Sequence, residues 1–256
     1  MAALAPVRFA VSIERIFTDK PFEQRMEYVA DQGFKAFEFG LRKGKDMNIT
    51  HALRMALRLE VSAFEATAIP LTDPAQRKAA LAEVERSAAL AIDLACPTLI
   101  VASGHTTVGL SRDEQRRHLV DTLAEAAETA ADADLVLALQ PQNTIDCPES
   151  FLWSMDEAAT IVRAIDSPNV QLCFNVYHQQ ISEGNLSKRL SEYLPLIAHV
   201  QVADVPGRHE PGSGEINYEH IFGLLRERGY RGYIGLDYLP LLDPIVSLRA
   251  VRALGT

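Results

Sequence analysis

The chain has 256 residues, of which 48% are hydrophobic and 23% are charged, and its formal net charge is −9. This composition can bury a large core and argues against disorder, and the length is close to the ~250 residues typical of an eight-stranded β/α barrel. The negative charge argues against nucleic acid or an anionic membrane as a partner, because both require basic surface; it still allows a small anionic substrate held by a local Arg or Lys.

Strands and helices are predicted to alternate along the whole chain. Short apolar runs between turn residues predict strands, and longer segments with helical periodicity predict helices. The expected strands cover residues 8–13, 35–39, 61–66, 98–102, 135–139, 170–174, 197–202 and 233–236. The expected helices cover residues 22–32, 48–59, 74–94, 111–131, 155–165, 186–193, 217–228 and 245–254, with a capping box of Ser111 and Glu114.

Eight strand–helix units without a linker predict one α/β domain over residues 1–256, a (β/α)8 TIM barrel. A doubly wound open sheet is the alternative, but it usually carries a glycine-rich phosphate loop after its first strand. The corresponding segment here, Ser12-Ile13-Glu14-Arg15, has no glycine. The longest expected loops, which follow strands four to seven, place the chemistry in the second half of the chain.

The cysteines and the apolar runs indicate the compartment. The three cysteines form no C-x-x-C, which favours a reducing environment and gives no zinc framework. The first residues lack a basic and apolar leader, and no apolar run reaches the ~18 residues of a membrane span. A cytoplasmic protein is therefore expected.

Four expected strands end in a polar residue: Gln140, Asn175, Gln201 and Asp237. In a parallel barrel, catalytic groups lie at the carboxyl ends of the strands. Three of these four side chains are neutral amides, where divalent-metal chemistry would require carboxylates. The pattern therefore indicates an enzyme scaffold whose metal site has been altered.

The segment from Gln201 to Tyr218 is the richest in polar residues. It contains Arg208 and Glu215 among several glycines and prolines, a composition typical of a mobile lid or of a solvated surface loop. Arg208 can hold a carboxylate or phosphate with two parallel hydrogen bonds.

This segment closely resembles hydroxypyruvate isomerases, members of the xylose-isomerase-like barrel superfamily. The resemblance extends to residues 34–39, 104–106, 140–143 and 174–180 and so covers nearly the whole chain. It implies a barrel enzyme that moves a proton between adjacent carbons through an enediol, with one divalent metal at the mouth. The family's ligands, usually Glu, Asp, Gln or His, and Glu, correspond here to Gln140, Asn175, Gln201 and Asp237.

These substitutions lower the negative charge of the ligand set from about three to one. Amide oxygens offer only dipoles to a hard cation, so no cofactor is expected, and at most weak binding of Mg²⁺ or Mn²⁺. Gln140 and Asn175 are then either remnants of a lost site or hydrogen-bonding groups for an oxygen-rich substrate. Asp237 is expected to have a raised pKa, because no cation is foreseen near it, and to act as the base.

Further candidates follow other strands. Glu65, which ends the third strand, or His178 is expected to be the partner of Asp237 in proton transfer. The remaining predicted substrate contacts are Gln140, Asn175, Gln201, Arg208, His105 and Glu215. The resemblance supports His105 and His178, and it gives Glu38 a place near the barrel floor with a structural role.

The leading hypothesis is a metal-independent isomerase that transfers a proton next to the carbonyl of a small hydroxy-carbonyl or sugar-like substrate. The alternatives are a conventional metal-dependent hydroxypyruvate isomerase, a metal-free epimerase, dehydratase, lyase or cyclase of a specialised pathway, and a non-catalytic ligand-binding barrel. The superfamily often forms dimers or tetramers, so a homo-oligomer is a further option. Phe151 and Trp153 would then either pack against a neighbouring subunit or cap a ligand.

Overall fold

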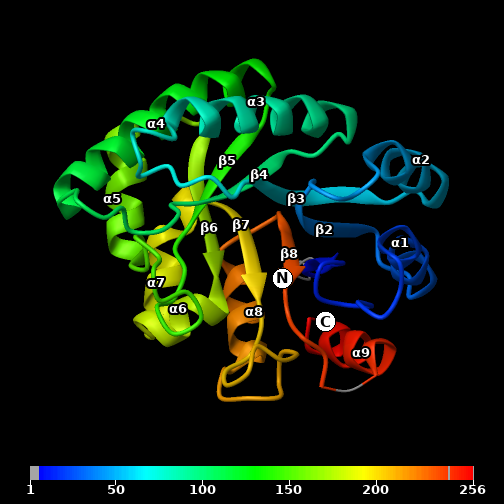
Figure 1. Cartoon of the computed structure of the whole chain (residues 1–256). Helices are drawn as coiled ribbons and strands as arrows, with labels where there is room; N and C mark the ends of the chain where they lie inside the picture. The colour runs from blue at the N-terminus through cyan, green and yellow to red at the C-terminus, as the bar shows by residue number, and fades with distance from the viewer. Residues whose placement is uncertain (1–5, 242, 256) are drawn as a thin grey trace.

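The computed structural model describes residues 6–241 and 243–255. In this part of the chain, eight parallel strands close into a barrel in sequence order, and β8 pairs with β1. The predicted TIM barrel is confirmed (Figure 1). The strands are β1 (Arg8–Ser12), β2 (Ala36–Leu41), β3 (Glu60–Thr67), β4 (Thr98–Ala102), β5 (Val136–Gln140), β6 (Val170–Asn175), β7 (Ile197–Val202) and β8 (Tyr233–Leu236).

Helices surround the barrel on its outer side, as Figure 1 shows. They are α1 (Phe22–Asp31), α2 (Met47–Leu57), α3 (Arg77–Asp93), α4 (Arg112–Asp132), α5 (Met155–Ile165), α6 (Val176–Ser182), α7 (Leu186–Tyr193), α8 (Tyr218–Glu227) and α9 (Pro244–Leu254), with a 3₁₀ turn η1 (Leu194–Leu196). The capping box of Ser111 and Glu114 is confirmed at the start of α4. No described helix has the length and apolar character needed to cross a membrane.

Helix α6 is not among the helices predicted from the sequence, which leave the residues between 174 and 186 as a loop. The helix follows β6 without a gap, and the side chain of Asn175 caps it by accepting a 3.2 Å hydrogen bond from the backbone N–H of His178. A seven-residue helix shows too few turns for a clear apolar period. The missed helix matters because it fixes the orientation of His178.

The strand period of two places polar residues of neighbouring strands on the barrel's inner face. Four buried residues, three of them small, occupy this face one step below the mouth, and they are Ala63, Ile100, Ala138 and Cys173. The larger apolar side chains of the same strands pack outward against the helices. The inner face therefore has room near its carboxyl end for a cluster of polar side chains.

Candidate active site

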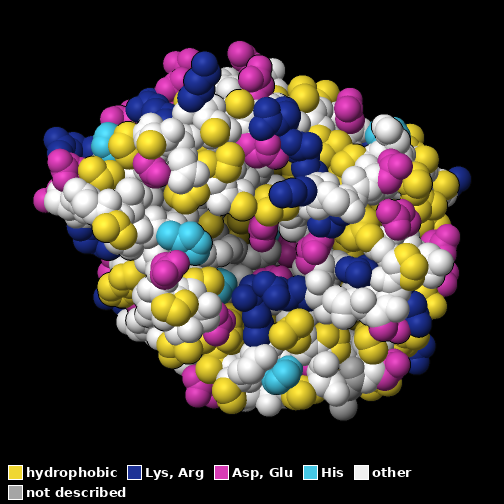
Figure 2. Space-filling view, in the orientation of Figure 1, with side chains coloured by type: hydrophobic (Ala, Val, Ile, Leu, Met, Phe, Trp, Pro, Cys, Tyr) yellow, Lys and Arg dark blue, Asp and Glu magenta, His cyan; other side chains and the backbone are white. Residues whose placement is uncertain are grey.

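A cavity of about 120 Å³ lies at the carboxyl ends of the strands. It is lined by Ser12, Glu14, Arg15, Glu38, Phe39, Gly40, Glu65, Ile100, Gln140, Gln142, Cys147, His178, Gln201, Arg208 and Asp237. Figure 2 shows a hollow near the centre of the molecule, where basic and acidic side chains meet. The catalytic end of a β/α barrel is this end, so the cavity is the candidate active site.

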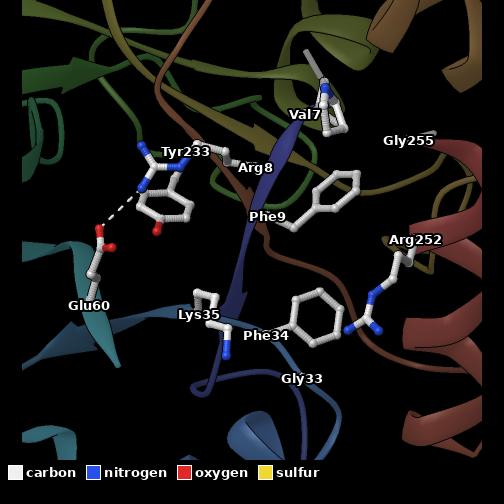
Figure 3. Close-up of a pocket in the computed structure, with 11 residues that line it drawn as sticks. Val7, Arg8, Phe9, Gly33, Phe34, Lys35, Glu60, Tyr233, Arg252 and Gly255 are labelled. Carbon is white, nitrogen blue, oxygen red and sulfur yellow. Dashed lines mark hydrogen bonds and ion pairs between the residues drawn. The ribbon is translucent and has the colours of Figure 1, made fainter. Parts of the chain in front are cut away.

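A larger cavity of about 460 Å³ lies at the opposite, amino end of the strands (Figure 3). Its two arginines have structural partners: Arg8 lies 3.9 Å from the ring centre of Tyr233 and forms a 3.2 Å ion pair with Glu60. Arg252 lies 4.2 Å from the ring centre of Phe34. Side chains at this end of a barrel contribute to stability rather than to catalysis.

The small cavity brings together six of the side chains predicted from the sequence. They are Glu65, Gln140, His178, Gln201, Arg208 and Asp237. Three others do not line it. Asn175 is buried beside the cavity, His105 is exposed near Glu149, and Glu215 is exposed and accepts a 3.0 Å hydrogen bond from Gln180.

Asp237 is held by two arginines. Nε of Arg15 donates to Oδ1 at 2.7 Å, and Nη2 of Arg208 donates to Oδ2. Burial alone would raise the pKa of Asp237, but the charges and hydrogen bonds of Arg208 and Arg15 together lower it below its ordinary value. The expectation of a raised pKa was therefore wrong, because it assumed that no cation lies nearby. A carboxylate with a lowered pKa is a weak proton acceptor.

The three amides form a buried network around one oxygen. Oε1 of Gln201 accepts hydrogen bonds from Nε2 of Gln140 and, at 3.1 Å, from Nδ2 of Asn175. Nδ2 of Asn175 also donates to Oδ2 of Asp237 at 3.3 Å. The amides therefore use three of their six side-chain polar atoms on each other and on Asp237, while Oδ1 of Asn175 caps α6 and Nε2 of Gln201 donates to Glu38.

Glu38 lies beneath this network and is almost fully buried. Its carboxylate accepts a 2.7 Å hydrogen bond from Gln201 and lies 2.7 Å from Nε2 of His199. Burial raises the pKa of Glu38, although the hydrogen bond with His199 opposes the shift. A Cβ at Gly235 would lie 2.1 Å from Oε2 of Glu38, so only glycine leaves room for this carboxylate.

His178 is a neutral hydrogen-bond donor. Its Nδ1 lies 3.2 Å from the backbone N–H of Asn143 and 2.7 Å from the Asn143 side-chain amide. A backbone N–H can only donate, so Nδ1 accepts and the proton resides on Nε2. Burial, with a contribution from the charge of Arg208, lowers the pKa of His178 to about 3. His178 can thus donate a hydrogen bond to an oxygen in the cavity but is a poor base near neutral pH.

Glu65, unlike Asp237, combines a raised pKa with a carboxylate that has no fixed partner among the described residues. Its side chain is exposed to solvent at the cavity. The protein that surrounds the carboxylate partly desolvates it, and this, together with the charge of Asp237, raises its pKa despite the opposing charge of Arg15. The structure gives its side chain no hydrogen bond or ion pair within the described residues. A carboxylate with a raised pKa and no fixed partner is suited to exchange a proton with a bound molecule.

The loop after β7 is fixed by hydrogen bonds within it. The buried carboxylate of Asp204 accepts hydrogen bonds from the backbone N–H groups of Gly212, Gly214 and Ile216 at 2.9–3.1 Å. Arg208 has a positive φ of 60°, and its backbone oxygen accepts a 2.7 Å hydrogen bond from Leu239. The composition, which left a mobile lid and a solvated surface loop open as alternatives, builds a folded support that holds Arg208 at the cavity.

Sequence reasoning missed several lining residues, above all Arg15. Arg15 lies three residues beyond the end of β1, in a turn whose N–H groups bond back to Ser12. Its position just after the first strand could have indicated a residue of the active site, because the catalytic end of a barrel lies there. This segment was tested only for a glycine-rich phosphate loop. Glu14, which forms a 2.6 Å ion pair with Lys45, was missed for the same reason.

The residues present do not fit a divalent cation. Both oxygens of Asp237 are engaged by guanidinium groups, and the oxygen of Gln201 accepts hydrogen bonds from neighbouring amides. Among the described residues, no group of three or more His, Cys, Asp or Glu side chains has an arrangement that could hold a metal. Hard cations require anionic oxygens, and the one carboxylate among positions 140, 175, 201 and 237 is already paired with two guanidinium groups.

Comparison with known proteins agrees with this architecture. Residues 26–250 match the model of the xylose isomerase-like TIM barrel family. A human protein provisionally named hydroxypyruvate isomerase is 34% identical, with 98% of this chain and 96% of the human protein covered. The 2-oxo-tetronate isomerase of Cupriavidus necator is 31% identical over 91% of this chain and 93% of its own.

Solved structures share the fold. The crystal structure of a family 2 AP endonuclease from Brucella melitensis superposes with a TM-score of 0.91 at 28% identity and covers 95% of this chain and 97% of its own. The 3-keto-D-glucoside 4-epimerase of E. coli has a TM-score of 0.82 at 22% identity, with 97% of each chain covered. The protein therefore belongs to the xylose isomerase-like TIM barrel family and is an enzyme of the isomerase type.

Proposed function

We propose that the enzyme interconverts a 3-hydroxy-2-oxo acid of three or four carbons and the corresponding 2-hydroxy-3-oxo acid, without a resident metal. The observation that carries this proposal is the pairing, in one small cavity, of a carboxylate with a raised pKa and a pair of arginines that exceeds the charge of Asp237. One end of the site is suited to move a proton and the other to hold an anion.

The reaction balances without an oxidant. Glu65 removes the proton from the carbon that bears the hydroxyl, and the electron pair moves to form an enediolate with the former carbonyl oxygen. The proton then returns to the neighbouring carbon, while the hydroxyl oxygen loses its proton to the enediolate oxygen and becomes the new carbonyl. His178, which carries its proton on Nε2, donates a hydrogen bond to the developing oxyanion.

The substrate class follows from cavity size and charge. The cavity of about 120 Å³ is well below the ~300–1,000 Å³ of sites for drug-sized ligands, which favours a substrate of few carbons. The cluster of Arg15, Arg208 and Asp237 carries one net positive charge and supports binding of a carboxylate at this side of the cavity, whereas Glu14, Glu38 and Glu65 line the rest. The named substrates of the relatives, hydroxypyruvate and 2-oxo-tetronate, are both 3-hydroxy-2-oxo acids.

Proton NMR of the purified enzyme incubated with hydroxypyruvate, and separately with 2-oxo-tetronate, tests the proposal. The expected result is the signal of the 2-hydroxy-3-oxo product with at least one of the two acids. If neither acid is converted and neither exchanges its C–H protons with solvent, the proposed reaction is wrong.

A further inference from the structure

We infer that the guanidinium of Arg15 takes the place of the divalent cation and polarises the substrate carbonyl, an inference that rests on the proposed function. The resemblance to hydroxypyruvate isomerases places a metal among the groups at positions 140, 175, 201 and 237. In this chain the carboxylate at position 237 binds Arg15 instead.

The charge arrangement supports this substitution. Replacing two carboxylates by Gln140 and Asn175 removes the anionic oxygens that would hold a cation. A guanidinium is permanently charged, so the cavity keeps a cation that does not depend on bound metal. One remaining carboxylate, Asp237, is enough to orient it.

Arg15 has donors left for a substrate. In the described part of the chain, its side chain makes one hydrogen bond, from Nε to Asp237, so both Nη groups remain available at the cavity. The side chain is about one-third exposed, in contrast to 9% for Asp237. Because Nε is hydrogen-bonded to Asp237 and both Nη groups are free within the described chain, the guanidinium can donate two parallel hydrogen bonds to the oxygens of an enediolate.

Arg15, rather than Arg208, faces the proposed base. The charge of Arg15 lowers the pKa of Glu65, whereas Arg208 acts more strongly than Arg15 on His178 and on Tyr177, whose ring centre lies 5.2 Å from the Arg208 guanidinium. Arg208 also donates from Nε to the backbone oxygen of Asp237 at 3.3 Å, which leaves only one nitrogen free within the described residues. The two arginines therefore have different roles: Arg15 donates to the reacting carbonyl, and Arg208 binds the carboxylate of the substrate.

The first experiment needs no substrate. We would restore the carboxylates in a Gln140→Glu, Asn175→Asp, Asp237→Glu variant, with and without Arg15→Met, and measure MnCl₂ binding by calorimetry after checking folding by circular dichroism. The inference predicts at least tenfold tighter Mn²⁺ binding when Arg15 is replaced. Equal affinity in the two variants would overturn it. Because no turnover is measured, this outcome is independent of whether the proposed reaction is correct.

The second experiment covers the case in which the restored variants do not fold. Arg15→Ala in the otherwise native chain is expected to lose about 10²–10³-fold in kcat. Added guanidinium chloride at non-denaturing concentration should recover part of this loss, and the acid limb of the pH profile of kcat/KM should move to higher pH, because the charge of Arg15 opposes the raised pKa of Glu65. A purely structural Arg15 would show no rescue by guanidinium, and that result would contradict the inference.

Discussion

Nε of Arg15 and Oδ1 of Asp237 lie 2.7 Å apart, although 222 positions separate the two residues in the sequence. They meet because the barrel closes through pairing of β1 with β8, which brings the first and last strand ends together. This contact changes the chemistry expected of Asp237. Asp237, which was predicted to be the base, instead binds the guanidinium of Arg15, and we assign proton transfer to Glu65.

Replacement of Glu65 by Gln should abolish proton transfer. We expect kcat to fall by about 10²–10⁴-fold, because the amide cannot accept a proton. Stability to urea should stay within about 0.5 kcal/mol, since the carboxylate has no partner among the described residues. Glu14→Gln, at a lining carboxylate paired with Lys45, is the matched control and should retain most activity. Equal losses in both variants would argue against Glu65 as the base.

The ionisation of Glu65 should determine the acid limb of the pH profile of kcat/KM. Glu65 must be ionised to accept a proton, so kcat/KM should rise as the pH rises through its pKa. Because burial and Asp237 raise that pKa, the midpoint should lie above the ordinary value of 4.5. Initial rates between pH 4 and 8 measure it, and a midpoint below 4.5 would point to a carboxylate with a lowered pKa, such as Asp237.

His178 should make the fold sensitive to mild acid. Its pKa is about 3 in the folded state, against an ordinary value of 6.5. Between these values only the unfolded chain takes up the proton, so stability should fall as the pH falls, by up to about 1.4 kcal/mol per pH unit. Urea unfolding at pH 5, 6 and 7 should show a shallower slope for His178→Gln. The change His105→Gln at the exposed loop histidine is the control, and equal slopes in all three proteins would contradict a buried neutral His178.

Arg208 should govern binding of the carboxylate more than the chemical step. For Arg208→Lys we expect KM for a 3-hydroxy-2-oxo acid to rise about 10–100-fold with a smaller change in kcat, because a single ammonium cannot bind the backbone oxygen and Oδ2 of Asp237 as the guanidinium does and still present a separate N–H group to the substrate. A substrate analogue that lacks the carboxylate should show little difference between the two proteins. A loss confined to kcat would instead assign Arg208 to the reacting carbonyl.

Gln201 is the centre of the amide network, and its loss should destabilise the fold. Gln201→Leu leaves the side-chain N–H groups of Gln140 and Asn175 without their shared acceptor and removes a donor from Glu38. Each unsatisfied buried group costs about 1–3 kcal/mol, so unfolding free energy should fall by at least that amount. Gln142→Leu, at a lining amide with no side-chain hydrogen bond in the described residues, is the control and should cost under about 0.5 kcal/mol.

The sequence predicted the parts of the site that strand geometry determines. Gln140, Gln201 and Asp237 end buried strands, so the period of two and the rule for barrel ends together place them at one mouth. His105 and Glu215 lie on loops, where no such period fixes the direction of a side chain, and they do not line the cavity.

Contacts between distant elements could not be predicted in this way. The lowered pKa of Asp237 depends on Arg15 and Arg208, which reach it from the loops after β1 and β7. The proton position on His178 depends on Asn143, 35 positions earlier, and on a short helix whose periodicity is too brief to detect. Both properties arise from tertiary neighbours rather than from local pattern.

Solvent deuterium exchange at the substrate carbon, followed by proton NMR in D₂O with enzyme treated with EDTA, tests most directly whether proton transfer proceeds without a divalent cation. If no divalent cation takes part, a 3-hydroxy-2-oxo acid should exchange its C–H protons at the same rate with and without the chelator. Arg15→Ala should slow this exchange. Exchange that stops in EDTA and returns on addition of Mg²⁺ or Mn²⁺ would contradict it.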